Sequence, residues 1–137
     1  MSWLTNYYER ENGATPEALA RLRSVAPSSL PQSFYDLLQF SNGGRWPAGG
    51  GQFSFQLSPA EWIAEGQEFE PRRPGRFHEF LKGFVLIGIN GSGVCIGFDV
   101  RDREPWPIVE IDTSADEAER VIVVAKDFDA FLDMLGV

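Results

Sequence analysis

The stretch LPQSFYDLLQFSNGG, residues 30–44, decides the start of the fold. Its large apolar residues recur with helical spacing, so they would share one face of an α-helix and pack against a core. These residues are Leu30, Phe34, Leu37 and Leu38. Pro31 is compatible with this helix because it lies in the first turn. Asn42 and Gly43 favour the left-handed conformation that closes a helix, so the stretch predicts a buried helix that ends in a tight turn.

Helix signals also stand on both sides of this stretch. Thr15, Pro16 and Glu17 supply an N-cap, a proline at the first helical position and an acid in the first turn, and Pro27 ends that helix. Near the end of the chain, Asp127 would cap a closing helix. The apolar stripe of the closing helix consists of Phe128, Phe131, Leu132 and Leu135.

Strand patterns occupy much of the region between these helices. They are either alternating apolar and polar side chains or short apolar runs, and Asn90-Gly91-Ser92-Gly93 is a typical hairpin loop between two of them. The predicted strands are residues 53–57, 84–89, 94–100, 108–111 and 121–124. Consecutive strands with short connections favour an antiparallel sheet.

Two further segments separate the strands. Ser58-Pro59-Ala60-Glu61 has the signature of a capping box and predicts the start of a short helix. Residues 65–82 show no strand period, and we interpret them as a loop with a short helical turn near Phe77–Leu81. Ala48-Gly49-Gly50-Gly51 is interpreted as a glycine-rich loop.

Together these elements predict an α+β fold, a mainly antiparallel β-sheet covered by helices. The chain has 137 residues, of which 43% are hydrophobic and 23% charged. This length and composition are those of one ordinary globular domain, so we expect residues 1–137 to form a single domain.

The charge balance favours some partners over others. Twenty acidic residues against twelve basic ones give a net charge of -8, which opposes binding to a phosphate backbone and favours a cationic partner. One run of acids contains no basic residue: Glu104, Glu110, Asp112, Asp116, Glu117 and Glu119. Such a run is either a solvated face that keeps the protein soluble or a docking surface for a basic protein.

The sequence offers no membrane or export signal. Residues 1–9 have neither a basic nor an apolar segment of the signal-peptide kind, and no apolar run reaches the length of a membrane span. A lone cysteine, Cys95, cannot form an internal disulfide and suits a reducing compartment. We therefore expect a soluble, cytoplasmic protein that does not act at a membrane.

Residues for catalysis are scarce. His78 is the single histidine, so the chain has no histidine cluster for a metal. A Ser-His-Asp set would have to use His78, and no Gly-x-Ser-x-Gly elbow occurs. Gly49-Gly50-Gly51 and Gly91-Ser92-Gly93 are explained better by turns than by phosphate binding, because neither carries the residues of a P-loop. We expect no catalytic residue, no metal and no cofactor.

Tryptophans near irregular segments are the remaining candidates for residues that bind a partner. Trp46, Trp62 and Trp106 lie in or beside predicted loops, where tryptophan either completes the core or anchors a partner. The predicted partner-binding set combines two of them with the run of acids. It consists of Trp46, Trp106, Glu104, Glu110, Asp112, Asp116, Glu117 and Glu119.

Four segments resemble one family. LPQSFYDLLQFSNGG is similar to the Leu-Pro, aromatic, Leu, Asn-Gly-Gly signature of the SUKH superfamily, which includes yeast cell-wall assembly regulators and bacterial immunity proteins. FVLIGINGSGVCIGFDV (84–100) resembles the strand, glycine turn and strand of that family, PWPIVEID (105–112) its next strand, and VAKDFDAFLDML (124–135) its closing helix.

The resemblance implies a non-enzymatic α+β domain that works by binding another protein. In its bacterial branch such proteins neutralise a co-inherited toxin, often a nuclease, inside the producing cell. A nuclease carries positive charge to hold its substrate, which fits an acidic inhibitor. The alternative implied by the eukaryotic branch is a regulatory or scaffold adaptor for an endogenous partner.

Overall fold

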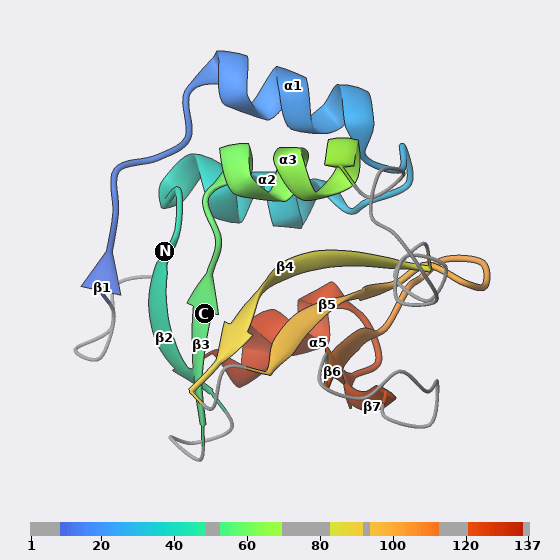
Figure 1. The fold of residues 1–137 in the computed structure, drawn as a ribbon. Helices are drawn as coiled ribbons and strands as arrows, with labels where there is room; N and C mark the ends of the chain where they lie inside the picture. The colour runs from blue at the N-terminus through green and yellow to red at the C-terminus, as the bar shows by residue number, and fades with distance from the viewer. Residues whose placement is uncertain (1–8, 49–52, 70–82, 92–93, 113–120, 136–137) are drawn as a thin grey trace.

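The structure, a computed structural model, describes residues 9–48, 53–69, 83–91, 94–112 and 121–135. Helices and strands follow one another as the sequence predicts for an α+β fold (Figure 1). The helices are α1 (Pro16–Val25), α2 (Gln32–Phe40), α3 (Ala60–Phe69) and α5 (Phe128–Met134). The strands are β1 (Glu9–Arg10), β2 (Gly44–Ala48), β3 (Phe53–Leu57), β4 (Phe84–Asn90), β5 (Cys95–Asp99), β6 (Ile108–Ile111) and β7 (Val121–Ala125).

In the part of the chain that the structure describes, one antiparallel sheet contains seven strands in the order of the sequence, from β1 to β7. Each strand therefore pairs with its neighbour along the chain, as the short connections predict. The predicted antiparallel sheet covered by helices is confirmed. The two edges of the sheet are β1, which has two residues, and β7, which has five.

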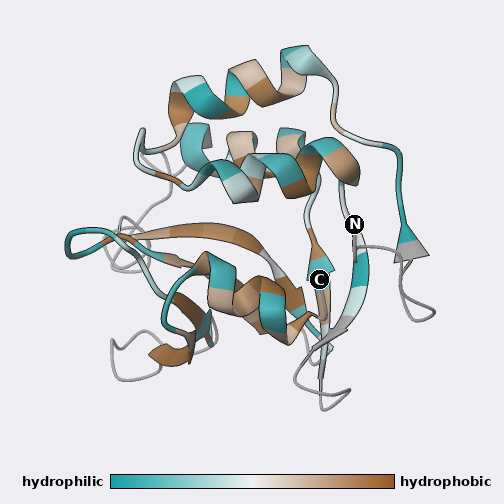
Figure 2. Cartoon of the chain, turned by 180° about the vertical axis from the view of Figure 1, so that it is seen from behind, coloured by the Kyte–Doolittle hydropathy of each residue, from teal (hydrophilic) through white to brown (hydrophobic). Residues whose placement is uncertain are grey.

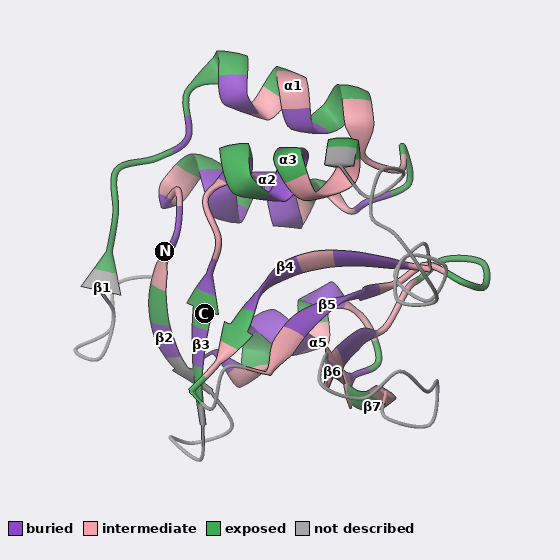
Figure 3. Ribbon diagram, in the orientation of Figure 1, coloured by how far each residue is buried: buried purple, intermediate pink, exposed green. Residues whose placement is uncertain are grey.

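The helices lie in two groups around the sheet. Figure 1 shows α1, α2 and α3 together at one side, with α5 behind β4 and β5. Seen from the opposite side, α5 lies in front of strands that are largely hydrophobic (Figure 2). The apolar stripe predicted for residues 30–44 is buried, and Phe34, Leu37 and Leu38 have no exposed surface (Figure 3).

Aromatic rings join α2, α5 and the sheet into one core. The Phe34 ring meets the rings of Phe98 on β5 and Phe128 on α5 edge-on, at centroid distances of 5.3 and 5.7 Å. Phe98 and Phe128 also stack on each other at 5.5 Å. Edge-to-face and offset stacked geometries are the favourable ones for aromatic pairs, so this cluster fixes where α5 begins.

Strand β4 is apolar on both faces, which explains its near-continuous hydrophobic run. Val85 and Ile87 belong to the main core, whereas Phe84 belongs to a second buried cluster with Val109 and Ile111 of β6. The register between β4 and β5 shifts between Leu86 and Gly88. A sheet buried on both sides loses the alternation that marks a half-exposed strand.

The structure adds two strands that the sequence did not predict, β1 and β2. Trp46 lies opposite Phe55 in the pairing of β2 with β3 and stacks on its ring at 6.2 Å, with no exposed surface. The interpretation of the segment around Trp46 as irregular is wrong. Glycine and proline in the strand hid its period, and β1 pairs only with Gly44 and Arg45.

The end of α2 also differs from the prediction. Ser41 follows the helix in an extended conformation, with φ of -150°, and its N–H donates to the Leu37 carbonyl at 2.8 Å. Among the described residues positive φ occurs only at glycines, at Gly43 (111°) and Gly44 (108°). Asn42 is therefore not left-handed, and the reversal of the chain depends on the two glycines.

Helix α3 is longer than predicted. It runs through Phe69, so the interpretation of residues 65–69 as loop is wrong. Ala60, Ile63 and Ala64 are buried at helical spacing, and the Glu68 carboxylate accepts two hydrogen bonds from Arg21 of α1, at 2.9 and 2.7 Å. The helical turn predicted near Phe77–Leu81 lies outside the described residues. No helix within the described ranges is long and apolar enough to cross a membrane.

Candidate protein-binding surface

The structure brings together two members of the predicted partner-binding set, Glu104 and Trp106, in the connection between β5 and β6. Glu110 lies on β6 and Asp112 directly after it. Trp46 is in the core, and a side chain with no exposed surface cannot anchor a partner, so it is left out of the surface described below. Three other members, Asp116, Glu117 and Glu119, lie outside the described residues.

Glu104 and Trp106 line a cavity of about 280 Å³, here called the acidic pocket. Three segments far apart in the sequence meet there: the approach to α2, the β5–β6 connection and the start of α5. The lining residues are Ser29, Pro31, Glu104, Pro105, Trp106, Asp127, Phe128 and Asp129. The partner-binding set predicted from the sequence left out the two aspartates, because helix-cap and turn roles explained this pair of carboxylates better than a binding role did.

Each wall of the acidic pocket is held by a contact of its own. The Trp106 Nε1–H donates to the Asp102 carbonyl at 2.6 Å, and the half-buried indole packs against the main core. The Asp127 Oδ1 accepts from the Ala130 N–H at 2.8 Å, the predicted cap of α5. The Asp129 Oδ1 accepts from the Ser33 hydroxyl at 3.1 Å. Glu104 is exposed, so its carboxylate is open to a partner.

An ion pair flanks this region on the β5 side. Arg101 donates from Nε and Nη2 to the Asp99 carboxylate, at 2.9 and 2.8 Å. Burial raises the pKa of Asp99, but the hydrogen bonds from Arg101 outweigh it and hold that pKa below its usual value. The same hydrogen bond raises the pKa of Arg101. The Arg101 charge is thus engaged within the protein.

Glu110 lies at the β7 edge of the sheet. It pairs with Ile122 across β6 and β7, so the two side chains share a face. Ile122 is 61% exposed and the next residue, Val123, 63%. These two are exposed although both are large and apolar, and the sequence indicated them only as strand residues. Ile122 places apolar surface beside Glu110, whereas Val123 lies opposite Val109 on the other face of the strand.

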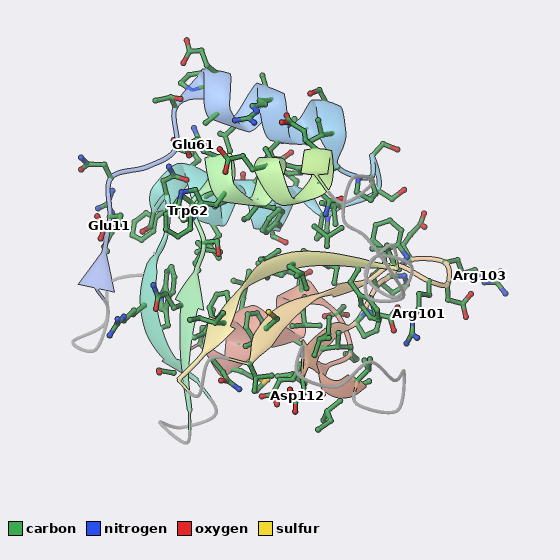
Figure 4. The ribbon with its side chains drawn as sticks, viewed as in Figure 1. Glu11, Glu61, Trp62, Arg101, Arg103 and Asp112 are labelled. Atoms are coloured by element: carbon green, nitrogen blue, oxygen red, sulfur yellow. The ribbon has the colours of Figure 1, made fainter. Side chains whose placement is uncertain are left out.

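Trp62 is the most exposed of the three tryptophans that the sequence singled out. It lies on α3, not in a loop, and 65% of it is exposed. The buried stripe of α3 does not include it, since Ala60, Ile63 and Ala64 form that stripe. Figure 4 shows Trp62 and Glu61 at the beginning of α3, across the molecule from Arg101 and Arg103.

The start of α3 is capped by a residue from the opening stretch. The Asn42 Oδ1 accepts from the Ala60 N–H at 2.6 Å, and the Asn42 Nδ2 donates to the Glu61 Oε1 at 2.8 Å. The Ser58 N–H donates to the Ile87 carbonyl at 2.9 Å. The helix begins where the capping-box signature predicts, but the reciprocal bonds of that motif are replaced by bonds to Asn42.

The family follows from comparison with known proteins. The model of the SMI1 / KNR4 family (SUKH-1) matches residues 13–134. The chain belongs to this family. A comparison with curated proteins finds no match. The predicted resemblance to the SUKH superfamily is therefore confirmed, and membership is consistent with a toxin-immunity or regulatory role that depends on protein binding.

The described residues offer no support for a metal site. Within the described ranges no group of three or more His, Cys, Asp or Glu side chains could hold a metal ion. His78 lies outside these ranges. Cys95 has a half-buried thiol that packs against the second cluster.

Proposed function

We propose that the protein is an immunity protein that binds and inhibits a basic toxin domain, and that this toxin is a nuclease. Family membership supports a protein-binding role, and the net charge of -8 favours a cationic partner. The observation that carries the proposal is the acidic pocket, in which the exposed Glu104 stands next to the half-buried Trp106.

The chemistry of the acidic pocket suits a basic side chain. A guanidinium or ammonium group is attracted both by carboxylates and by the face of an indole ring. Glu104, Asp127 and Asp129 supply the carboxylates and Trp106 the indole. A toxin that presents an arginine or lysine there would lose its positive surface to the inhibitor, and with it the surface that holds a phosphate substrate.

The other acids of the predicted partner-binding set would mainly accelerate association. Charges at the rim of an interface steer the approach of an oppositely charged partner and are sensitive to salt. Glu110 lies on β6 and Asp112 directly after it; both are half-buried and would act in this way. Asp116, Glu117 and Glu119 stay part of the proposed surface on their charge alone.

We also propose that the protein acts without catalysis, cofactor or membrane, in the cytoplasm, and that residues 1–137 form one domain. The scarcity of histidine and cysteine in the sequence supports the first part. The family match over residues 13–134 supports the second. Screens for hydrolase, nuclease and transferase turnover should be blank, and an activity that His78→Ala abolishes would contradict this.

Co-expression with the toxin domain encoded beside the gene tests the proposal. The intact protein should restore growth, and a variant with Glu104→Lys, Glu110→Lys and Asp112→Lys should restore it poorly while it remains folded. Glu17→Lys, an exposed acid on α1, is the matched control and should rescue fully. Rescue by the triple variant would move the interface elsewhere. Absence of rescue by the intact protein would favour the regulatory adaptor.

A further inference from the structure

A second surface of the domain lies at the start of α3. It is here called the Trp62 surface, and it comprises Glu11, Asn42, Glu61, Trp62 and Glu65. Trp62 is 65% exposed and belongs to neither apolar cluster. Packing among the described residues therefore does not account for a tryptophan at this position, and tryptophan is enriched among residues that dominate protein–protein binding.

The Trp62 surface is fixed by hydrogen bonds from the turn after α2. Asn42 holds both the first turn of α3 and the Glu61 carboxylate, at 2.6 and 2.8 Å. The Glu11 N–H donates to the Ser41 hydroxyl at 2.9 Å, and the Asn42 N–H to the Asn12 carbonyl at 2.7 Å. The segment with Glu11 is thereby tied to the same turn, and Figure 4 shows Glu11, Glu61 and Trp62 on the same side of the molecule.

Its charge defines the partner. Glu11, Glu61 and Glu65 are all exposed. Glu61 and Glu65 also act on the charge of Arg21 of α1, whose guanidinium is engaged by Glu68 through two hydrogen bonds that raise the pKa of Arg21. An exposed indole with carboxylates on the same helix is complementary to a cation that has a flat face.

We propose that the Trp62 surface is a second docking surface, which takes an arginine side chain of a basic protein. The guanidinium can stack on the indole face and donate to a carboxylate with its fork of N–H groups, whereas lysine is a point charge. A second copy of this chain is a poor occupant, because it would bring the same acids together. The Trp62 surface and the acidic pocket lie beyond opposite ends of α2.

The inference rests on the proposed function only for the basic character of the partner. Affinity for the neighbouring toxin domain should fall about 30-fold or more with Trp62→Ala, chiefly through faster dissociation. Ile89→Ala, another exposed apolar residue outside both surfaces, should change it less than about 2-fold. Intact protein that binds while Trp62→Ala binds equally well overturns the inference and leaves the proposed function standing.

A peptide titration tests the Trp62 surface without the toxin. The indole N–H resonance of Trp62 is assigned with Trp62→Phe and followed during addition of the peptide Gly-Arg-Gly-Arg-Gly. It should shift in the intact protein and shift less in Glu61→Gln. An unmoved resonance, or an equal shift with Gly-Lys-Gly-Lys-Gly, overturns the inference. If the toxin domain fails to bind the intact protein, the proposed function is lost and this titration still decides the arginine site.

Discussion

The two ends of α2 carry surfaces of the same charge that are built in different ways. At its start, the acidic pocket consists of side chains that also fold the domain: Phe128 is in the core, Asp127 caps α5 and Trp106 is bonded to its own loop. Beyond its end, Trp62 is exposed and lies outside the buried stripe of α3. A loss of binding therefore has different meanings at the two places.

This difference decides which substitutions are informative. A substitution of a buried or half-buried member of the acidic pocket changes binding and stability together, so the exposed Glu104 is the clearer reporter on recognition. At the Trp62 surface, substitution of Trp62 itself reports on recognition, and Asn42 is the residue that holds this surface in place. Similar electrostatics thus call for different experiments, and the predictions below separate the two surfaces by their effect on folding.

The largest effect is expected for Phe128→Ala in the acidic pocket. The Phe128 ring packs against Phe34, Phe98 and Phe131, at 5.7, 5.5 and 6.1 Å, and is 2% exposed. Its removal should lower the free energy of unfolding by about 3–5 kcal/mol. Denaturant titration measures this, with the exposed Asp133→Ala on the same helix as control. A loss below about 1 kcal/mol would mean that Phe128 lines the pocket without contributing much to the stability of the core.

Gly43→Ala should come next, and it acts on the support of the Trp62 surface. Gly43 has φ of 111°, which a residue with a Cβ rarely adopts. An added Cβ would lie 3.4 Å from the Leu57 carbonyl oxygen, an ordinary contact, so the cost comes from the backbone and should be about 1–2 kcal/mol. Thermal unfolding checks it. Full stability combined with lost partner binding would show that the turn serves recognition and not folding.

Asn42→Ala should cost about 1 kcal/mol, because it removes the cap of α3. Asn42→Asp is the matched variant. Its carboxylate still accepts from the Ala60 N–H, but it has no N–H to donate to the Glu61 carboxylate and repels it instead. Stability should therefore be partly restored in the aspartate variant, while binding at the Trp62 surface is not. Equal stability of Asn42→Ala and the intact protein would argue that the Asn42 cap contributes nothing to folding.

The role of Asn42 also shows what the sequence could predict and what it could not. Helix and strand periods gave the order of the main elements, because apolar spacing reports directly on which side chains are buried, as for Phe34 and Leu37. The Asn42 cap is a long-range contact to Ala60, across 18 positions, which local spacing does not encode. The signature of a helix start was correct and the identity of its partner was not.

The candidate site was predictable in part for the same reason. Composition and the run of acids indicated a basic partner, and Glu104 and Trp106 do meet in one pocket. Exposure was not predictable residue by residue. Trp46 and Trp62 both stand near turns, yet one stacks on Phe55 in the core and the other is exposed. That outcome depends on which strand lies opposite, a property of the whole fold.

A smaller effect is expected from the ion pair beside the acidic pocket. The pKa of Asp99 is lower in the folded protein than its ordinary value of 3.8, so the pair stabilises the fold above that value and is lost as the pH falls through the folded-state pKa. Asp99→Asn should cost less than about 1 kcal/mol at neutral pH, since solvent screens the pair through Arg101, whose side chain is 44% exposed, while the Asp99 side chain is 16% exposed. The difference from the intact protein should vanish once the pH lies below the folded-state pKa of Asp99. A difference in the free energy of unfolding that grows as the pH falls would contradict this expected pH dependence.

The smallest effect on stability is expected for Trp62→Ala, and this makes it the sharpest test of the comparison. Little apolar surface is buried by Trp62, and alanine has a higher helix propensity than tryptophan, so the free energy of unfolding should change by less than about 0.5 kcal/mol. Trp46→Ala, which empties a buried site against Phe55, should instead cost about 3–5 kcal/mol. Urea titrations of both variants give the two values side by side. A cost above about 1.5 kcal/mol for Trp62→Ala would show that the exposed indole supports the fold. Its effect on binding would then no longer distinguish recognition from stability, and the two ends of α2 would be alike.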